Sequence, residues 1–250
     1  MNIYESDKAL AEYLLFHYGS ASEIAIDPLY PSQALGFAVR CAELVIRHAE
    51  PTKGRVLDLG CAVGSSSFTL SKYFDEVVGI DFSASFIQAA GTLKKLRSID
   101  YQRQDEGVLT TPLVARLEPE ARSGHVFFEQ GDACHLRKDL GKFEALLMAN
   151  LICRLPDPAA CLERSKELVN SGGVLVITSP CSWMTEFTPR EKWLGGFMRH
   201  GVPVRTLDGI KEILVPDFRL VETSEEPFLI REHARKYQLS SAQVSVWRRL

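Results

Sequence analysis

The sequence predicts an α/β fold, with a mostly parallel sheet that is covered by helices on both faces. Short apolar runs alternate with segments of helical period through the middle of the chain, and strands that alternate with helices pair in parallel. The first apolar run, 55–59, ends in a glycine turn from Gly60 to Gly64, and the run 76–81 ends in Asp81. Such a strand–turn–helix–strand unit typically holds a nucleoside-bearing ligand at the carboxyl ends of the strands.

Composition limits the classes of function. A chain of 250 residues with net charge −3 suits one domain, and it has no bulk basic field for nucleic acid or an anionic membrane. The amino-terminal residues lack a basic stretch followed by an apolar one, so we expect a cytoplasmic protein. The longest apolar run, around 145–153, contains Asn150 and is too short to span a bilayer. The six scattered cysteines form no C-x-x-C pair, which predicts reduced thiols and no metal.

Two helices are expected before the first strand, over residues 6–18 and 32–49. Apolar residues recur in both at helical spacing. Ser6 or Asp7 is expected to cap the first helix, and Ser32 the second. We expect the pair to cover one end of the sheet.

The alternation of elements continues to Pro180 and changes after it. In chain order we expect strand 55–59, helix 65–73, strand 76–81, helix 84–97, strand 125–130, strand 143–150, helix 158–169 and strand 173–179. The pair Gly172–Gly173 should end the last helix and start the last strand. Residues 98–124 are too long for a simple connection, and we interpret them as an insertion, in the form of a hairpin, over the cofactor edge.

The segment after Pro180 is rich in aromatic residues. A helix is expected to start near Pro189, and another to cover 206–214. Two long strands, 218–231 and 241–249, should form an antiparallel hairpin at the sheet edge. The whole is one domain, divided into an N-terminal helical cap (1–50), a cofactor-binding core (54–180) with the insertion 98–124, and a substrate cap with closing strands (181–250).

The glycine turn limits the choice of cofactor. Its spacing is G-x-x-x-G, with Ala62 where a dinucleotide site carries a glycine for the pyrophosphate. The chain has no G-x-x-x-x-G-K-[ST] motif for a nucleoside triphosphate. Asp58 adds a negative charge near the turn, which suits a cationic cofactor or an ammonium group. Asp81 follows Gly60 at about the spacing at which an acid reaches a ribose diol.

At this point the sequence resembles the class I S-adenosylmethionine-dependent methyltransferases, which have a Rossmann-like, mostly parallel seven-stranded sheet. The resemblance rests on five collinear segments, namely VLDLGCAVG, VVGIDFS, GDAC, LLMANLICRLPDP and NSGGVLVITSP. It implies S-adenosylmethionine as cofactor and S-adenosylhomocysteine as product. The implied cofactor residues are Asp58, Gly60, Cys61, Gly64, Asp81, Phe82, Asp132, Ala133 and Asn150.

Within this set the resemblance implies particular contacts. Asp81 would hold the ribose, Phe82 and Ala133 would flank the adenine, and Asp132 would bond its exocyclic amine. Asn150 would face the methyl group. Two plainer interpretations stay open: Asp132 as a helix cap, and Asn150 as a strand-end turn residue.

A narrower resemblance covers nearly the whole chain. Segments such as SDKALAEYLLFHYG, TSPCSWMTEFTPREKWLGGF and PFLIREHARKYQ resemble the methyltransferase unit of ovothiol biosynthesis, which is often fused to the iron-dependent 5-histidylcysteine sulfoxide synthase. The resemblance implies transfer of a methyl group to the π imidazole nitrogen of 5-thiohistidine, by a standalone enzyme or by a domain of a longer protein. A sulfoxide synthase is a possible partner.

The residues that would serve the acceptor are chosen by segment and side-chain chemistry. Asn150, His233 and Tyr18 are catalytic candidates, although no motif singles out a base. Substrate-binding candidates are an arginine for the carboxylate and aromatic residues for the ring, namely Arg231, Arg40, Trp183 and Phe187. Two other functions remain open: methylation of another small carboxylate or thiol, and a non-catalytic cofactor-binding subunit.

Overall fold

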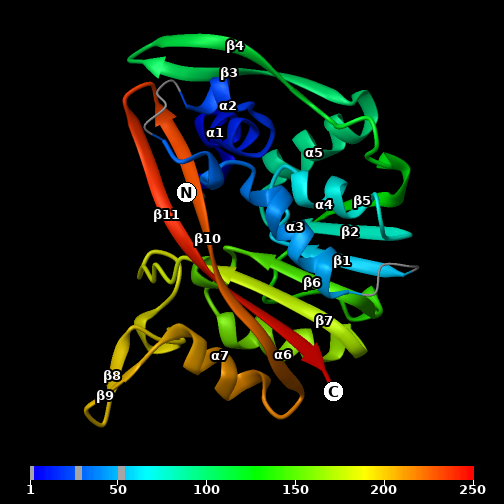
Figure 1. Cartoon of the computed structure of the whole chain (residues 1–250), viewed down its shortest axis with the longest axis vertical. Helices are drawn as coiled ribbons and strands as arrows, with labels where there is room; N and C mark the ends of the chain where they lie inside the picture. Colours follow the sequence, from blue (N-terminus) through cyan, green and yellow to red (C-terminus); the bar gives the residue numbers. More distant parts are fainter. Residues whose placement is uncertain (1–2, 26–29, 50–53) are drawn as a thin grey trace.

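The computed structural model describes residues 3–25, 30–49 and 54–250. Residues 1–2, 26–29 and 50, which the expected N-terminal cap includes, lie outside this part of the chain. The described residues form a seven-stranded sheet in the order β10-β11-β7-β6-β1-β2-β5 (Figure 1). Its strands are β1 (Arg55–Leu59), β2 (Glu76–Asp81), β5 (Val126–Gln130), β6 (Phe143–Ala149), β7 (Val169–Ser179), β10 (Phe218–His233) and β11 (Lys236–Arg249).

The first five of these strands pair in parallel, whereas β11 runs antiparallel to both β7 and β10. This arrangement confirms the expected mostly parallel sheet with a closing antiparallel hairpin. Because successive side chains of a strand point to opposite faces, Val56 packs into one apolar core and Leu57 into a second. The sheet therefore separates two cores.

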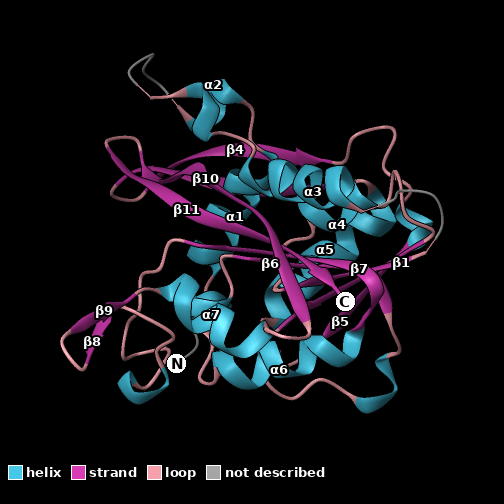
Figure 2. Cartoon of the chain, turned by 60° about the horizontal axis from the view of Figure 1, so that its bottom comes forward, coloured by secondary structure: helices cyan, strands magenta, loops and turns pink. Residues whose placement is uncertain are grey.

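Helices cover both faces of the sheet. The helices are α1 (Asp7–Tyr18), α2 (Ala21–Ile24), α3 (Phe37–His48), α4 (Ser65–Leu70), α5 (Ala84–Leu96), α6 (Pro158–Leu168) and α7 (Thr206–Leu214). Figure 2 shows α3, α4 and α5 on one side and α6 and α7 on the other, and their buried residues belong to the two separate cores. Helix α1 begins as expected, because Ser6 Oγ accepts a hydrogen bond from the Ala9 N–H at 3.2 Å.

Three expectations about local structure are wrong. Helix α3 begins at Phe37 and not at Ser32, because Gly36 with φ +68° turns the chain into the helix. Strand β7 begins at Val169 and continues through Gly172, where its register against β6 shifts. Pro189 precedes only a single 3-10 turn, Arg190–Lys192, and no longer helix.

Two further hairpins extend from the body. Strands β3 (Ser98–Glu106) and β4 (Leu109–Arg116) pair antiparallel, which confirms a hairpin within 98–124; it packs on α1, α5 and β10. The expected strands 218–231 and 241–249 are too short, since only Ala234 and Arg235 lie between β10 and β11. The tip of the β10–β11 hairpin meets the tip of the β3–β4 hairpin, where the Ala234 N–H donates to the Asp105 carbonyl at 3.0 Å. A small hairpin of β8 (Phe197–Arg199) and β9 (Val202–Val204) projects beside α7 (Figure 1).

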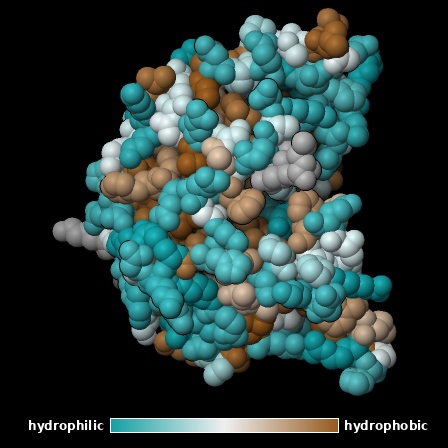
Figure 3. All heavy atoms as spheres, turned by 180° about the vertical axis from the view of Figure 1, so that it is seen from behind, coloured by the Kyte–Doolittle hydropathy of each residue, from teal (hydrophilic) through white to brown (hydrophobic). Residues whose placement is uncertain are grey.

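One face of the surface is mixed in polarity, and the cysteines are unpaired. Hydrophilic and hydrophobic residues are interspersed over the face seen in Figure 3. Within the described ranges, no helix is both long enough and apolar enough to cross a membrane. All six cysteines are free.

Candidate cofactor and acceptor site

The glycine turn between β1 and α4 is fastened to the end of β2. The N–H groups of Gly60 and Cys61 both donate to the Ile80 carbonyl, at 2.8 and 3.1 Å. The next residue, Ala62, has φ +47° and donates its N–H to Asp81 Oδ2 at 2.9 Å. The turn and the acidic residue that the sequence predicted to serve one ligand are therefore one hydrogen-bonded unit.

Both glycines of the turn are required by its geometry. Gly60 has φ +80°, and a Cβ there would lie 2.9 Å from Leu151 Cδ1. Gly64 has φ +87°, and a Cβ there would lie 2.7 Å from the Phe128 ring. Side chains are disfavoured at such positive φ values, so these positions keep the backbone of the turn close to its neighbours.

Asp81 ends β2 with its carboxylate directed at backbone N–H groups. Its Oδ1 accepts from the Ser83 N–H at 2.9 Å, in addition to the bond with Ala62. Burial raises the pKa of this carboxyl, and the backbone hydrogen bonds oppose that rise. Phe82, the predicted adenine neighbour, follows with 62% of its surface exposed, so its ring is available to a ligand.

Asp58 is fully buried beneath the turn. Its Oδ2 accepts hydrogen bonds from the hydroxyls of Ser66 and Ser67, at 2.7 and 2.6 Å. Its Oδ1 is buried and has no hydrogen-bond partner among the described residues. Burial raises the pKa of Asp58 to about 6. A buried carboxylate oxygen without a donor is costly, and an ammonium group would satisfy it, so the residue fits the amino group of a methionine-derived cofactor.

The third predicted segment follows β5. Asp132 accepts the Cys134 N–H at 2.8 Å and lies 2.8 Å from His135 Nδ1. Ala133 between them is buried. The carboxylate of Asp132 thus closes a local turn and does not cap a helix, although one interpretation of the sequence had it as a cap. Its predicted role toward adenine stays a prediction.

Asn150 lies at the carboxyl end of β6, where the sequence placed it. Its φ is +52°, and its N–H donates to the carbonyl and the Oγ1 of Thr178, at 2.9 and 3.0 Å. Thr178 Oγ1 in turn donates to Asn150 Oδ1 at 3.1 Å. Because that oxygen is engaged, the amide nitrogen is the part of the side chain that can donate to a ligand. No sequence motif pointed to Thr178.

The end of α1 covers the turn. Tyr18 Oη donates to the Val63 carbonyl at 2.8 Å, and Ser65 Oγ donates to the His17 carbonyl at 3.2 Å. Burial raises the pKa of Tyr18, so its hydroxyl stays protonated as a donor. Burial lowers the pKa of His17 to about 3, so that ring is neutral at physiological pH. The sequence named Tyr18 for this site but missed His17, which no pattern distinguishes from a helix-surface residue.

The first residues of the chain meet the segment after β7 over the strand ends. The Tyr4 carbonyl accepts from Ser83 Oγ at 3.2 Å, and the Tyr4 ring stacks on Phe187 at a centroid distance of 6.4 Å. The guanidinium carbon of Arg154 lies 4.9 Å from the centre of the Phe187 ring. Tyr4 and Arg154 were missed. The only available signal was that Arg154 is the one basic residue in the segment that contains Asn150.

Trp183 belongs to the same C-terminal segment but faces α7. Its Nε1 donates to Thr206 Oγ1 at 2.9 Å, and its ring stacks on Trp193 at 6.4 Å. These contacts join parts of the cap to one another. Its predicted role in substrate binding remains a prediction.

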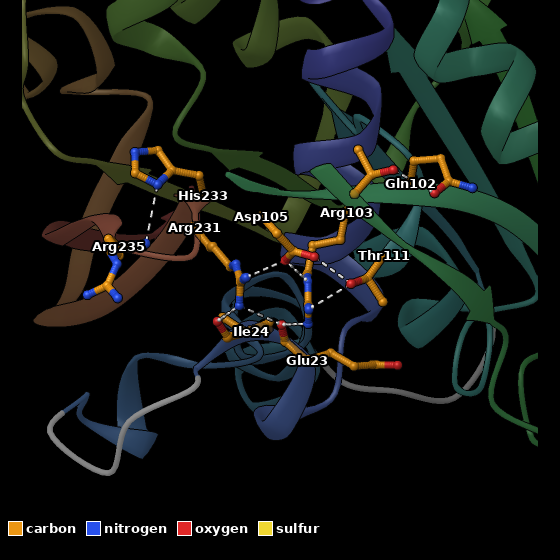
Figure 4. A network of polar contacts seen from close by, with 10 residues as sticks. Glu23, Ile24, Gln102, Arg103, Asp105, Thr111, Arg231, His233 and Arg235 are labelled. Carbon is orange, nitrogen blue, oxygen red and sulfur yellow. Dashed lines mark hydrogen bonds and ion pairs between the residues drawn. The ribbon is translucent and has the colours of Figure 1, made fainter. Parts of the chain in front are cut away.

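Three further candidates lie elsewhere in the structure. Arg40 pairs with Glu226 at 2.7 Å and also donates to two backbone carbonyls, which ties α3 to β10. Arg231 and His233 lie at the end of β10, beside the β3–β4 hairpin (Figure 4). No contact of these three side chains with the glycine turn is found within the described residues. That part of the chain also holds no group of three or more His, Cys, Asp or Glu placed to bind a metal.

Comparison with known proteins identifies the family. Residues 36–215 match the family model of a methyltransferase domain. The ubiquinone biosynthesis O-methyltransferase of Coxiella burnetii is 28% identical over 130 residues, which are 51% of this chain and 44% of that protein. The chain therefore spans less than half the length of the curated relatives it matches.

Solved structures share the fold at low identity. The N-methyltransferase NodS of Bradyrhizobium japonicum WM9, in complex with S-adenosyl-L-homocysteine, has a TM-score of 0.55 and 13% identity, covering 96% of this chain and 98% of that one. The magnesium protoporphyrin IX methyltransferase of Synechocystis PCC 6803, with bound S-adenosylhomocysteine, has a TM-score of 0.52 and 16% identity over 85% and 82%. The [4+2]-cyclase SpnF has a TM-score of 0.61 and 14% identity over 99% and 94%, so the fold alone does not name a reaction. The family model, the sheet order and the buried acids at the turn together show that the chain belongs to the S-adenosylmethionine-dependent methyltransferase domain family with the class I Rossmann-like fold.

Proposed function

We propose that this chain methylates the π imidazole nitrogen of 5-thiohistidine to form ovothiol A, with S-adenosylmethionine as the methyl donor. The observation that carries the proposal is the stack of Tyr4 on Phe187, with Arg154 over the Phe187 ring, which brings residues from both variable segments together at the strand ends. Aromatic side chains suit a small planar acceptor. The same variable segments carry the resemblance to the ovothiol unit.

In this proposal the buried acids hold the cofactor. The Asp81 carboxylate binds the ribose diol, and Asp58 Oδ1 accepts from the ammonium group. Gly60, Cys61 and Gly64 line the methionine part, and Phe82, Asp132 and Ala133 surround the adenine. When bound, S-adenosylmethionine supplies an electrophilic methyl group on a sulfonium.

The protein must then choose one of three nucleophilic atoms on the acceptor. A thiolate is the stronger nucleophile, so the site has to hold the sulfur away from the methyl group and aim the ring nitrogen at it. We assign the positioning of the ring to Asn150. The hydrogen bond from Thr178 to its oxygen fixes the orientation of the amide, and its nitrogen is the atom that can donate to the ring. Tyr18 acts through the turn, because its hydroxyl is already bonded to Val63.

The test is a product assay with the purified chain and S-adenosylmethionine. Acceptors are 5-thiohistidine, histidine, ergothioneine and simple thiol acids, with mass spectrometry for product and NMR for the methylated atom. We expect one methyl group on the π nitrogen of 5-thiohistidine. Asp81→Asn should lose cofactor binding and product together, whereas the matched change at an exposed carboxylate, Glu120→Gln, should lose neither.

Other outcomes would replace this proposal. Methylation of the sulfur of 5-thiohistidine would make the chain an S-methyltransferase. Methylation of a thiol acid in preference to 5-thiohistidine would make it a methyltransferase for another small metabolite. Binding of S-adenosylhomocysteine with no product from any acceptor would favour a supporting subunit for a sulfoxide synthase.

A further inference from the structure

A separate cleft lies between α1, β3 and the end of β10. Its volume is about 370 Å³, within the range of roughly 300–1,000 Å³ that small-molecule sites occupy. The lining includes no residue of the glycine turn or of β2, and from the segment after Pro180 it includes Arg231 and Glu232 at the end of β10. The residues on which its chemistry depends are Leu10, Glu12, Leu14, Tyr101, Arg103 and Arg231.

One wall of this cleft carries an unbalanced positive charge. Arg103 Nε and an Arg231 terminal nitrogen bind the same oxygen of Asp105, at 2.9 and 2.8 Å (Figure 4). The other Asp105 oxygen accepts the Thr111 hydroxyl. Two guanidinium groups therefore share one carboxylate.

Arg231 has a donor to spare. Only 1% of its side chain is exposed. Its remaining hydrogen bonds are to the carbonyls of Glu23 and Ile24, at 3.2 Å each, and its guanidinium carbon lies 5.9 Å from the centre of the Tyr237 ring. Its Nε is buried and has no partner within the described ranges. A buried cation with an unused N–H favours an anionic acceptor, and a carboxylate matches its geometry.

The helix wall of the cleft offers the opposite charge. Glu12 on α1 has a buried Oε1 with no hydrogen-bond partner in the described part of the chain; the Lys8 ammonium lies 3.6 Å from it and is largely exposed. Glu232, the neighbouring acid, is already bonded to Lys236 at 2.6 Å and to Gln238 at 2.7 Å. A buried carboxylate oxygen that has only a long ion pair and no hydrogen bond calls for a closer ammonium or another strong donor.

Between the two charged walls the surface is apolar, with Leu10, Leu14 and Tyr101. We propose that this cleft binds a free amino acid with an apolar side chain, its carboxylate at Arg231 and its ammonium at Glu12. This site is additional to the one where cofactor and acceptor meet. Its occupant would contact the helix that also holds the glycine turn through Tyr18.

The experiment is calorimetric titration of the whole chain with L-phenylalanine in saturating S-adenosylhomocysteine. The S-adenosylhomocysteine fills the methionine part of the cofactor site, so L-phenylalanine cannot bind there. We expect one saturable site. L-phenylalaninamide, which lacks the carboxylate, and N-acetyl-L-phenylalanine, which lacks the ammonium, should each bind at least about tenfold more weakly, because each loses a charge-assisted hydrogen bond.

Two alanines of α1 provide matched variants. Ala11 lines the cleft and Ala9 does not, so Ala11→Leu should abolish binding of L-phenylalanine while Ala9→Leu keeps it. Glu12→Gln should reduce the preference for the free ammonium over the N-acetyl form. The proposal is overturned if L-phenylalanine shows no saturable binding, or if Ala11→Leu binds it as wild type does. Because no acceptor or methyl transfer enters this measurement, failure of the ovothiol assay would leave its result intact.

Discussion

Tyr18 in α1 donates its phenolic hydrogen to the Val63 carbonyl at 2.8 Å. This bond joins the first long helix of the chain to the glycine turn that follows the first strand. Together with the bond from Ser65 Oγ to the His17 carbonyl, at 3.2 Å, it makes α1 part of the wall of the proposed cofactor site. The position of the turn therefore depends on a residue that precedes it by 45 positions.

Tyr18→Phe removes this hydrogen bond and keeps the ring. We expect the free energy of unfolding to fall by about 1 kcal/mol, and the dissociation constant of S-adenosylhomocysteine to rise by about fivefold, because the Val63 carbonyl loses its donor. Chemical denaturation and calorimetry measure the two effects. Tyr73→Phe, at a ring with 47% of its surface exposed, is the matched control and should change neither. Unchanged affinity in Tyr18→Phe would remove α1 from the cofactor site.

Asp58→Asn should change how stability depends on pH. The pKa of Asp58 is about 6 in the folded chain and about 3.9 in an unfolded one. The folded state therefore holds the proton more tightly, and the free energy of unfolding falls as pH rises from about 4 to about 6. The expected loss is at most roughly 3 kcal/mol.

Urea denaturation at four pH values between 4 and 7 tests this expectation. The difference between wild type and Asp58→Asn should shrink with rising pH, and it should shrink less in saturating S-adenosylhomocysteine, whose ammonium group would stabilise the charged carboxylate. Parallel pH curves for the two proteins would contradict the assignment. Glu120→Gln, at an exposed position, serves as the control.

Arg154→Lys keeps the charge over Phe187 but loses the planar group. Lysine cannot stack in the same way or reach both the Ser182 carbonyl, at 3.0 Å, and the Ser182 hydroxyl, at 3.3 Å. We expect kcat/KM for the acceptor to fall about tenfold, with affinity for S-adenosylhomocysteine within about twofold of wild type. Steady-state kinetics and calorimetry separate the two. Arg219→Lys, on the exposed side of β10, should match wild type in both; an equal loss of cofactor affinity in Arg154→Lys would place Arg154 with the cofactor.

Substitution by alanine at Gly209 and at Gly91 should have opposite effects on the free energy of unfolding. A Cβ at Gly209 in α7 would lie 2.0 Å from the Leu194 carbonyl oxygen, whereas a Cβ at Gly91 in α5 meets no atom within 4 Å among the described residues. Gly209→Ala should therefore lower the free energy of unfolding by about 1–3 kcal/mol. Gly91→Ala should raise it by about 0.5–1 kcal/mol, because alanine restricts the unfolded chain and favours the helix. Denaturant melts of both variants measure these changes. A Gly209→Ala variant as stable as wild type would show that the backbone at Leu194 can move away from α7.

The sequence was informative where local chemistry decides the structure. Strands β1 and β2 have the predicted bounds, because each is a short buried apolar run that ends in a turn or a charge. The polar residues 236–240 gave no such signal, and they are strand only because β10 pairs with them. Gly36 sets the start of α3 through its positive φ. Ser32, a residue type that often caps helices, had predicted an earlier start.

The same division holds for the site. Asp58, Gly60 and Asp81 come together through bonds among neighbouring strand ends, which a parallel sheet brings to one edge. Tyr4 and His17 reach that edge through contacts between distant segments. Arg154 lies in the segment of Asn150, but only its contact with the distant Phe187 distinguishes it. Arg40 was predicted to bind a substrate carboxylate. It is bonded instead to Glu226, which is 186 positions away, so the sequence around Arg40 gave no sign of this partner.

The packing of α1 under both long hairpins has a consequence for synthesis. Arg231 bonds the carbonyl of Glu23 across 208 positions, and β3 and β10 both contact α1. Helix α1 leaves the ribosome well before the strands that contact it are made, and such non-local contacts form slowly. The packing of α1 is thus completed only late in synthesis, and a nascent chain that stops before β10 lacks part of the surface that holds this helix.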